Sequence, residues 1–102
     1  MAGLQGALEI TAQTVIQAVP GAVSCDLEDE AVVLHDGTYF TLNRLGAEVW
    51  RLMERPRRFA EVRDWILREY DVEAERCEAD LRAWLCEMRD RGLVKLLEEK
   101  GV

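Results

Sequence analysis

The chain contains few of the residues that build metal sites and disulfides. Its 102 residues include one histidine, His35, and three scattered cysteines, Cys25, Cys77 and Cys86, without a Cys-x-x-Cys pair. Because a structural zinc site needs about four Cys or His ligands at close spacing, we expect no bound metal. An odd number of dispersed cysteines predicts free, reduced thiols and a cytoplasmic protein.

Catalytic motifs are absent as well. The sequence has no Gly-x-Ser-x-Gly nucleophile elbow, no P-loop and no Gly-x-Gly-x-x-Gly fingerprint. Nucleophilic catalysis needs a nucleophile within hydrogen-bond reach of a base, and Cys25 with His35 and Asp36 is the one combination available. A polar residue at a hairpin end explains His35 more simply. We therefore expect neither enzyme activity nor a cofactor.

Long apolar runs and an excess of basic residues are also missing. No run approaches the roughly 18 residues of a membrane span, and no basic region precedes an apolar core at the N-terminus, as in a secretory signal. The net charge of −7 disfavours nucleic acids and anionic membranes as partners. With 49% hydrophobic and 32% charged residues, the composition is typical of one soluble globular domain.

The strongest structural signal present is the sequence AVVLHDGTYFTLN, residues 31–43. Asp36-Gly37 between two apolar arms predicts a β-hairpin with a two-residue type I′ turn. This turn pairs His35 with Thr38 and places residues on alternate faces. One face carries Ala31, Val33, His35, Thr38, Phe40 and Leu42, and the other carries Val32, Leu34, Tyr39 and Thr41. Because both faces are apolar, we expect helices to cover one, and the N-terminal segment or helix ends to cover part of the other.

The surrounding sequence predicts one sheet followed by helices. Residues 22–27 form a first strand and residues 28–30 a polar turn, so the three strands make an antiparallel meander with the last strand at an edge. Helices are predicted from the cap residue Asn43 to about Glu54, over 59–70, and over 73–91 before Gly92. The fold class is α+β, a three-stranded antiparallel sheet followed by three helices, winged helix-turn-helix-like. Residues 1–20 are expected to be weakly structured, with a short extended piece at 14–20, and residues 98–102 form a tail.

The predicted edge strand and last helix suggest a binding site. An edge strand presents unpaired backbone N–H and C=O groups, and an extended peptide can add there as a further strand. Leu81, Trp84, Leu85 and Met88 form an apolar stripe on the last helix, which could wall such a groove. The alternative is that all four residues are core.

The ordered set of motifs resembles the PqqD-like family, whose members recognise ribosomally made precursor peptides. Residues 30–53 carry the family's strand, turn and helix motifs as Val32-Val33-Leu34, Gly37, Tyr39-Phe40, Leu42-Asn43, Gly46 and Trp50. The match continues with Tyr70-Asp71-Val72, Ala79-Asp80, Leu81, Leu85 and Gly92-Leu93-Val94. It covers about three quarters of the chain, and residues 21–97 would be the peptide-recognition domain. The hairpin turn is shorter here than is common in the family.

The resemblance implies a non-catalytic, leader-peptide-binding chaperone. A leader peptide would add to the third strand at Thr38, Tyr39, Phe40, Thr41 and Leu42, and lie against the third helix at Asp80, Leu81, Trp84, Leu85 and Met88. The bound peptide would be delivered to a modifying enzyme, such as a radical S-adenosylmethionine enzyme or, in lasso-peptide systems, a leader peptidase. We expect a monomer or a weak homodimer, because the free edge could pair with a second copy.

Two other functions stay open: a winged-helix DNA-binding regulator, and a structural subunit that docks a protein at the same edge. The third helix has four basic residues, Arg76, Arg82, Arg89 and Arg91, against six acidic ones, a balance that repels phosphate. Basic residues gather instead at Arg51, Arg55, Arg57 and Arg58, which could meet an acidic partner or solvent.

Overall fold

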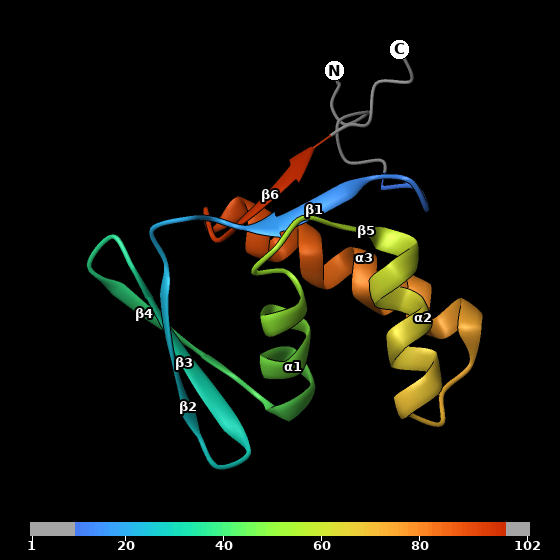
Figure 1. Ribbon diagram of the computed structural model, residues 1–102, viewed down its shortest axis with the longest axis horizontal. Helices are drawn as coiled ribbons and strands as arrows, with labels where there is room; N and C mark the ends of the chain where they lie inside the picture. The colour runs from blue at the N-terminus through green and yellow to red at the C-terminus, as the bar shows by residue number, and fades with distance from the viewer. Residues whose placement is uncertain (1–9, 98–102) are drawn as a thin grey trace.

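The computed structural model describes residues 10–97, which form two small antiparallel sheets and three helices (Figure 1). The strands are β1 (Val15–Ala18), β2 (Val23–Leu27), β3 (Glu30–His35), β4 (Thr38–Leu42), β5 (Arg57–Arg58) and β6 (Val94–Leu97), and the helices are α1 (Arg44–Leu52), α2 (Phe59–Glu69) and α3 (Ala74–Asp90). No helix in this part of the chain has the length and hydropathy needed to cross a membrane. The predicted tail, 98–102, lies outside the described residues.

The predicted hairpin is confirmed residue by residue. Strands β2, β3 and β4 form one sheet in that order, which we call the hairpin sheet. His35 pairs with Thr38 and Ala31 with Leu42, as the two-residue turn requires. Asp36 and Gly37 have φ values of 53° and 78°, both in the positive region that a type I′ turn demands.

The three helices also lie where periodicity predicts them, to within about two residues at their ends. The side chain of Asn43 caps α1, because its Oδ1 accepts a hydrogen bond of 2.8 Å from the Gly46 N–H. Helix α3 ends before Gly92, whose φ of 79° is readily adopted by glycine. The α+β class is therefore confirmed.

A second sheet, in the order β5-β1-β6, corrects the prediction of a single sheet. The extended piece expected at 14–20 is its central strand, β1, and we call this the terminal sheet. Val15 in β1 lies opposite both Leu97 and Arg58. Strands of two and four residues carry too little alternation to be recognised, and their partners are distant in the sequence.

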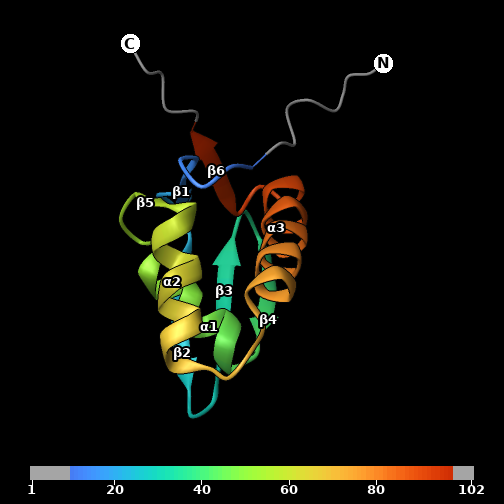
Figure 2. The same ribbon diagram turned by 90° about the vertical axis from the view of Figure 1, so that its right-hand side faces the viewer.

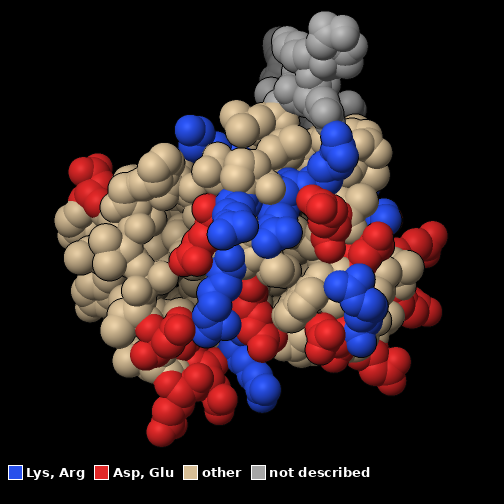
Figure 3. All heavy atoms as spheres, in the orientation of Figure 1, with Lys and Arg blue, Asp and Glu red and all other residues tan. Residues whose placement is uncertain are grey.

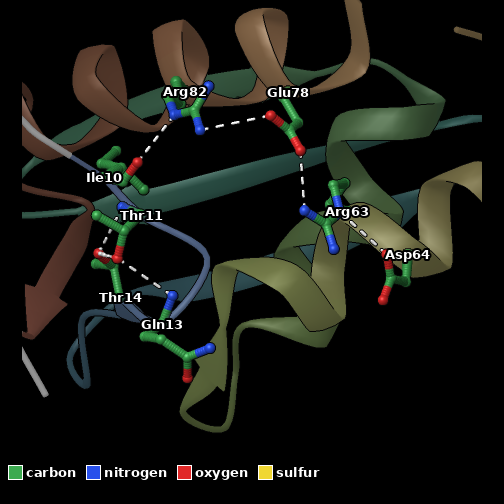
Figure 4. Close-up of polar contacts among 8 residues, drawn as sticks. All are labelled: Ile10, Thr11, Gln13, Thr14, Arg63, Asp64, Glu78 and Arg82. Atoms are coloured by element: carbon green, nitrogen blue, oxygen red, sulfur yellow. Dashed lines mark hydrogen bonds and ion pairs between the residues drawn. The ribbon is translucent and has the colours of Figure 1, made fainter. Parts of the chain in front are cut away.

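The segment before β1 is tied to α2 and α3 by backbone groups. Thr14 and Ala12 carbonyls accept hydrogen bonds of 2.8 and 3.1 Å from the N–H groups of Phe59 and Ala60 at the start of α2. Such N–H groups have no partner within their own helix. Arg82 of α3 donates through Nε to the Ile10 carbonyl at 2.9 Å, as Figure 4 shows. The segment is therefore bonded to the start of α2 and to the middle of α3.

An ion-pair network that includes Arg82 joins α2 to α3 beside this contact (Figure 4). Arg63 of α2 contacts Glu78 of α3 at 2.9 Å and Asp64 at 3.0 Å, and Glu78 also pairs with Arg82 at 3.5 Å. The hydrogen bonds that the Arg63 guanidinium donates to Asp64 and Glu78 raise the pKa of this group above its usual value. These contacts set the position of α3 relative to α2.

The core lies between the helices and one face of the hairpin sheet, which we call the inner face. Figure 2 shows α1 between α2 and α3 and in front of β3, which α1 contacts. The largest fully buried side chains come from both sheets and from all three helices: Phe59, Ile16, Met53, Leu85, Leu93, Val33, Val49 and Val62. The terminal sheet is therefore part of one shared core.

The opposite, outer face of the hairpin sheet is exposed. It carries Val23, Leu34 and Tyr39 side by side across the three strands. We expected helix ends or the N-terminal segment to cover part of this face. Within residues 10–97 no element does so, which corrects that expectation.

The terminal sheet yields a stability prediction. Ile16 is fully buried in β1, so Ile16→Ala should lower the free energy of unfolding by about 2–5 kcal/mol through lost burial and a cavity. Gln17 lies on the other face of β1, and the control Gln17→Thr should change it by less than about 0.5 kcal/mol. Urea unfolding measures both values. Equal losses for the two variants would show that β1 is not packed as described.

Candidate functional site

Strand β4 is one of the two edge strands of the hairpin sheet, and it is the one that faces α3 across a groove. It is the last strand in the order β2-β3-β4, and no other described strand pairs with it. In a type I′ turn the N–H of the fourth residue, Thr38, bonds to the first carbonyl, His35. Because bonded and non-bonded pairs alternate in antiparallel strands, Thr38, Phe40 and Leu42 direct their backbone groups to β3. Tyr39 and Thr41 therefore direct N–H and C=O groups to the free edge.

A groove of about 350 Å³ runs between this edge and α3. Its lining consists of Tyr39, Phe40, Thr41 and Leu42 from β4, Trp84, Glu87 and Met88 from α3, and Arg91, the residue that caps the C-terminus of α3. Leu42 and Met88 are buried, while Phe40 and Trp84 are half-buried against the core. The groove thus combines unpaired backbone groups on one side with apolar side chains.

One end of the groove is polar. The guanidinium of Arg91 contacts the Glu87 carboxylate at 3.0 Å and lies 5.4 Å from the centre of the Phe40 ring. A cation at this distance from an aromatic ring is attracted by its negative face. Arg91 therefore links α3 to β4 across the groove.

A second hollow, of about 280 Å³, lies on the other side of Trp84. It is lined by Asn43, Leu45, Gly46 and Val49 of the α1 region, Ile66, Val72, and Arg76, Cys77, Asp80, Leu81 and Trp84 of α3. Trp84 lines both hollows. A Cβ at Gly46 would lie 3.7 Å from the Trp84 ring and 3.2 Å from Asn43 Oδ1, so glycine allows α1 and Trp84 to approach this closely.

Most of the residues predicted for the site lie around these two hollows. Tyr39, Phe40, Thr41, Leu42, Trp84 and Met88 line the groove, and Asp80, Leu81 and Trp84 line the second hollow. Leu85 is fully buried in the core and lines neither, and Thr38 is exposed at the strand start and lines neither.

The sequence reasoning missed Glu87 and Arg91 in the groove. Both were visible as helical neighbours of Trp84, at i+3 and i+7, where side chains share a face. Arg76 was missed in the second hollow, although it lies one helical turn from the predicted Asp80, with which it pairs at 3.2 Å. The α1 residues of that hollow have no such local signal, because tertiary packing alone brings them to α3.

The site offers backbone hydrogen-bonding groups and apolar side chains, and its cysteine is buried. Burial raises the pKa of the Cys77 thiol above its usual value, which disfavours the reactive thiolate. Among residues 10–97, no group of three or more His, Cys, Asp or Glu side chains is placed to hold a metal ion. Backbone donors and acceptors beside an apolar wall suit an extended chain.

Comparisons with known proteins identify what the chain is similar to. A family model described as coenzyme PQQ synthesis protein D (PqqD) matches residues 30–94. Among solved structures, TbiB1 in complex with the TbiA(beta) leader peptide matches with a TM-score of 0.72 and 36% sequence identity, over 78% of this chain and 94% of that chain. No curated protein matches. Both hollows are lined entirely by residues within 30–94.

The thiols provide a test of the described packing. At pH 8, Cys25 is exposed and should react rapidly with Ellman's reagent, whereas Cys77, buried and with a raised pKa, should react only on unfolding. Cys86→Ser is used as the background, because Cys86 is partly exposed. Adding Cys25→Ser should abolish the fast absorbance change, and its persistence would contradict the burial of Cys77.

Proposed function

This chain belongs to the PqqD family, and we propose that it binds the leader peptide of a ribosomally made precursor and presents that precursor to a modifying enzyme. The groove between the free β4 edge and α3 is the observation that carries the proposal. TbiB1, at 36% identity, is a protein in complex with a leader peptide, which supports the same kind of ligand here.

The peptide would bind as a fourth strand beside β4. The N–H and C=O groups of Tyr39 and Thr41 would bond to its backbone, which gives affinity that depends little on sequence. Its inward side chains would contact the ring of Trp84 and the thioether of Met88, and these contacts would give selectivity. Leu85 would support this wall from the core, whereas Thr38, whose backbone groups face β3, would not bond to the peptide backbone.

The two ends of the wall would set how far the peptide extends. The pair formed by Arg91 and Glu87 lies on one side of Trp84, and the pair formed by Arg76 and Asp80 lies one to two helical turns away on the other. A peptide that continues past Leu42 would enter the second hollow near Leu81. The proposed site therefore has an apolar centre with a charged pair towards each end.

The proposed action is binding and delivery, with no chemical step on this chain. Holding the leader peptide would keep the rest of the precursor at high effective concentration near an enzyme that binds the same complex. A radical S-adenosylmethionine enzyme or a leader peptidase in the cytoplasm is the enzyme class we propose.

A DNA-binding regulator gains no support from α3. Arg82 of this helix pairs with Glu78 at 3.5 Å and Arg89 with Asp90 at 2.9 Å. Guanidinium groups already paired with carboxylates on an acidic helix attract phosphate weakly. The likeness of the fold to a winged helix, with the hairpin sheet as the wing, stays a hypothesis about shape.

A proline in β4 tests strand addition. Thr41→Pro removes an N–H that faces the free edge without removing one that bonds to β3. We expect the dissociation constant for the leader peptide encoded nearest to the chain's gene to rise at least about tenfold, consistent with a lost hydrogen bond plus a displaced strand. Isothermal titration calorimetry measures it, with the TbiA(beta) leader peptide as a second probe.

The matched control is Thr41→Val, which keeps the N–H and the branched shape and should bind as the unsubstituted protein does. Circular dichroism must show that both variants fold. Unchanged affinity in a folded Thr41→Pro protein would rule out strand addition at this edge. No binding of either peptide by the unsubstituted protein would refute the function itself.

The three tryptophans allow a test of the groove wall. Trp84 lines the groove, whereas Trp65, which is also half-buried, lies on α2 away from it. Trp84→Ala and Trp65→Ala should each lower stability, by up to about 3–5 kcal/mol. Only Trp84→Ala should also weaken peptide binding, by at least about tenfold. If titration calorimetry finds the same affinity loss in both, the effect is one of stability and Trp84 is not a contact.

A further inference from the structure

The outer face of the hairpin sheet is an apolar surface without a described cover. Val23, Leu34 and Tyr39 lie opposite one another across β2, β3 and β4 and are 63%, 49% and 70% exposed. The next row is Cys25, Val32 and Thr41. A contiguous apolar patch of this kind marks an interaction surface more often than single exposed residues do.

The charge around this face has one sign. Residues 22–43, which contain the whole hairpin sheet, include five acidic residues and no lysine or arginine. Asp26 is on the inner face, where it pairs with Arg51 at 3.1 Å. Glu28, Asp29, Glu30 and Asp36 lie at or beside the two turns. The side of the molecule over β2–β4, at the left of Figure 3, is largely tan, with red at its upper-left and lower margins and a blue group above it.

We propose that this outer face docks the modifying enzyme, through an enzyme surface with an apolar centre and basic margins. The inference rests on the proposed function, because it uses the same strand. The backbone edge of β4 would bind the peptide. The side chains of Tyr39 and Thr41, in the same strand, lie on the outer face. A peptide added to β4 continues the sheet, so its alternate side chains join this face.

The composite surface couples the two ligands. An enzyme docked on the outer face contacts this chain and the peptide strand together, so each ligand raises the affinity for the other by the same factor. A second copy of this chain fits less well, because its own acidic margins would face the acidic margins of the first.

A double substitution tests the docking surface in the full-length protein. Val23→Thr with Leu34→Thr keeps strand-compatible side chains and makes the centre of the patch polar, and neither residue lines the groove. The probe is the peptide-modifying enzyme encoded nearest to the chain's gene, purified alone. We expect its affinity for the peptide-loaded protein to fall at least about tenfold, while affinity for the leader peptide stays unchanged.

The matched control is Leu97→Thr, because Leu97 is an exposed apolar residue of the terminal sheet, at 40%. It should change neither affinity. Glu28→Lys with Glu30→Lys should slow association with the enzyme at low salt, because steering by opposite charge is lost.

Three results would overturn the inference. Unchanged enzyme affinity in the double variant would remove the outer face as the docking surface. An equal fall in peptide affinity would assign the face to peptide binding instead. A dimer of the unsubstituted protein in sedimentation, lost in the double variant, would assign it to self-association. Failure of the proposed function is distinguishable, because the unsubstituted protein would then bind no leader peptide.

Discussion

The two-residue turn at Asp36-Gly37 is the constraint on which the site depends. Both residues have positive φ, which few sequences allow, and the turn leaves a single register for β3 and β4. A shift of one residue would send the inner-face set of Phe40 and Leu42 to the outside. It would also exchange the backbone groups that reach the free edge. The groove therefore follows from a choice of two residues at the hairpin tip.

The terminal sheet fixes the position of α3, which forms the other wall of the groove. β6 follows α3 directly, and β1 holds it by pairing along its whole length. The N-terminal segment reaches α3 again through Arg82 and Ile10, which are 72 residues apart in the sequence. The family match covers residues 30–94, so β1 lies outside it and yet helps to position Trp84 and Met88.

Whether an element could be predicted from the sequence depends on how far apart in the sequence its contacting residues lie. The hairpin and the three helices depend on neighbours within a few residues, and there turn chemistry and periodicity were sufficient. The terminal sheet depends on pairs such as Val15 with Leu97, which no local pattern announces. The groove was intermediate: β4 and the stripe of Trp84 and Met88 were recognisable, while the hollow beside α1 required the tertiary packing.

The amino-acid composition of β4 indicates whether its edge is protected against pairing with another chain. Proteins commonly protect a permanently exposed edge strand with lysine, proline or an inward charge, because bare edges pair with other chains. The strand TYFTL has none of these devices, and its outward backbone groups belong to Tyr39 and Thr41. An unprotected edge beside an apolar groove is the arrangement that a strand-forming ligand requires. The same residues that leave β4 exposed to aggregation therefore make it suitable for peptide binding.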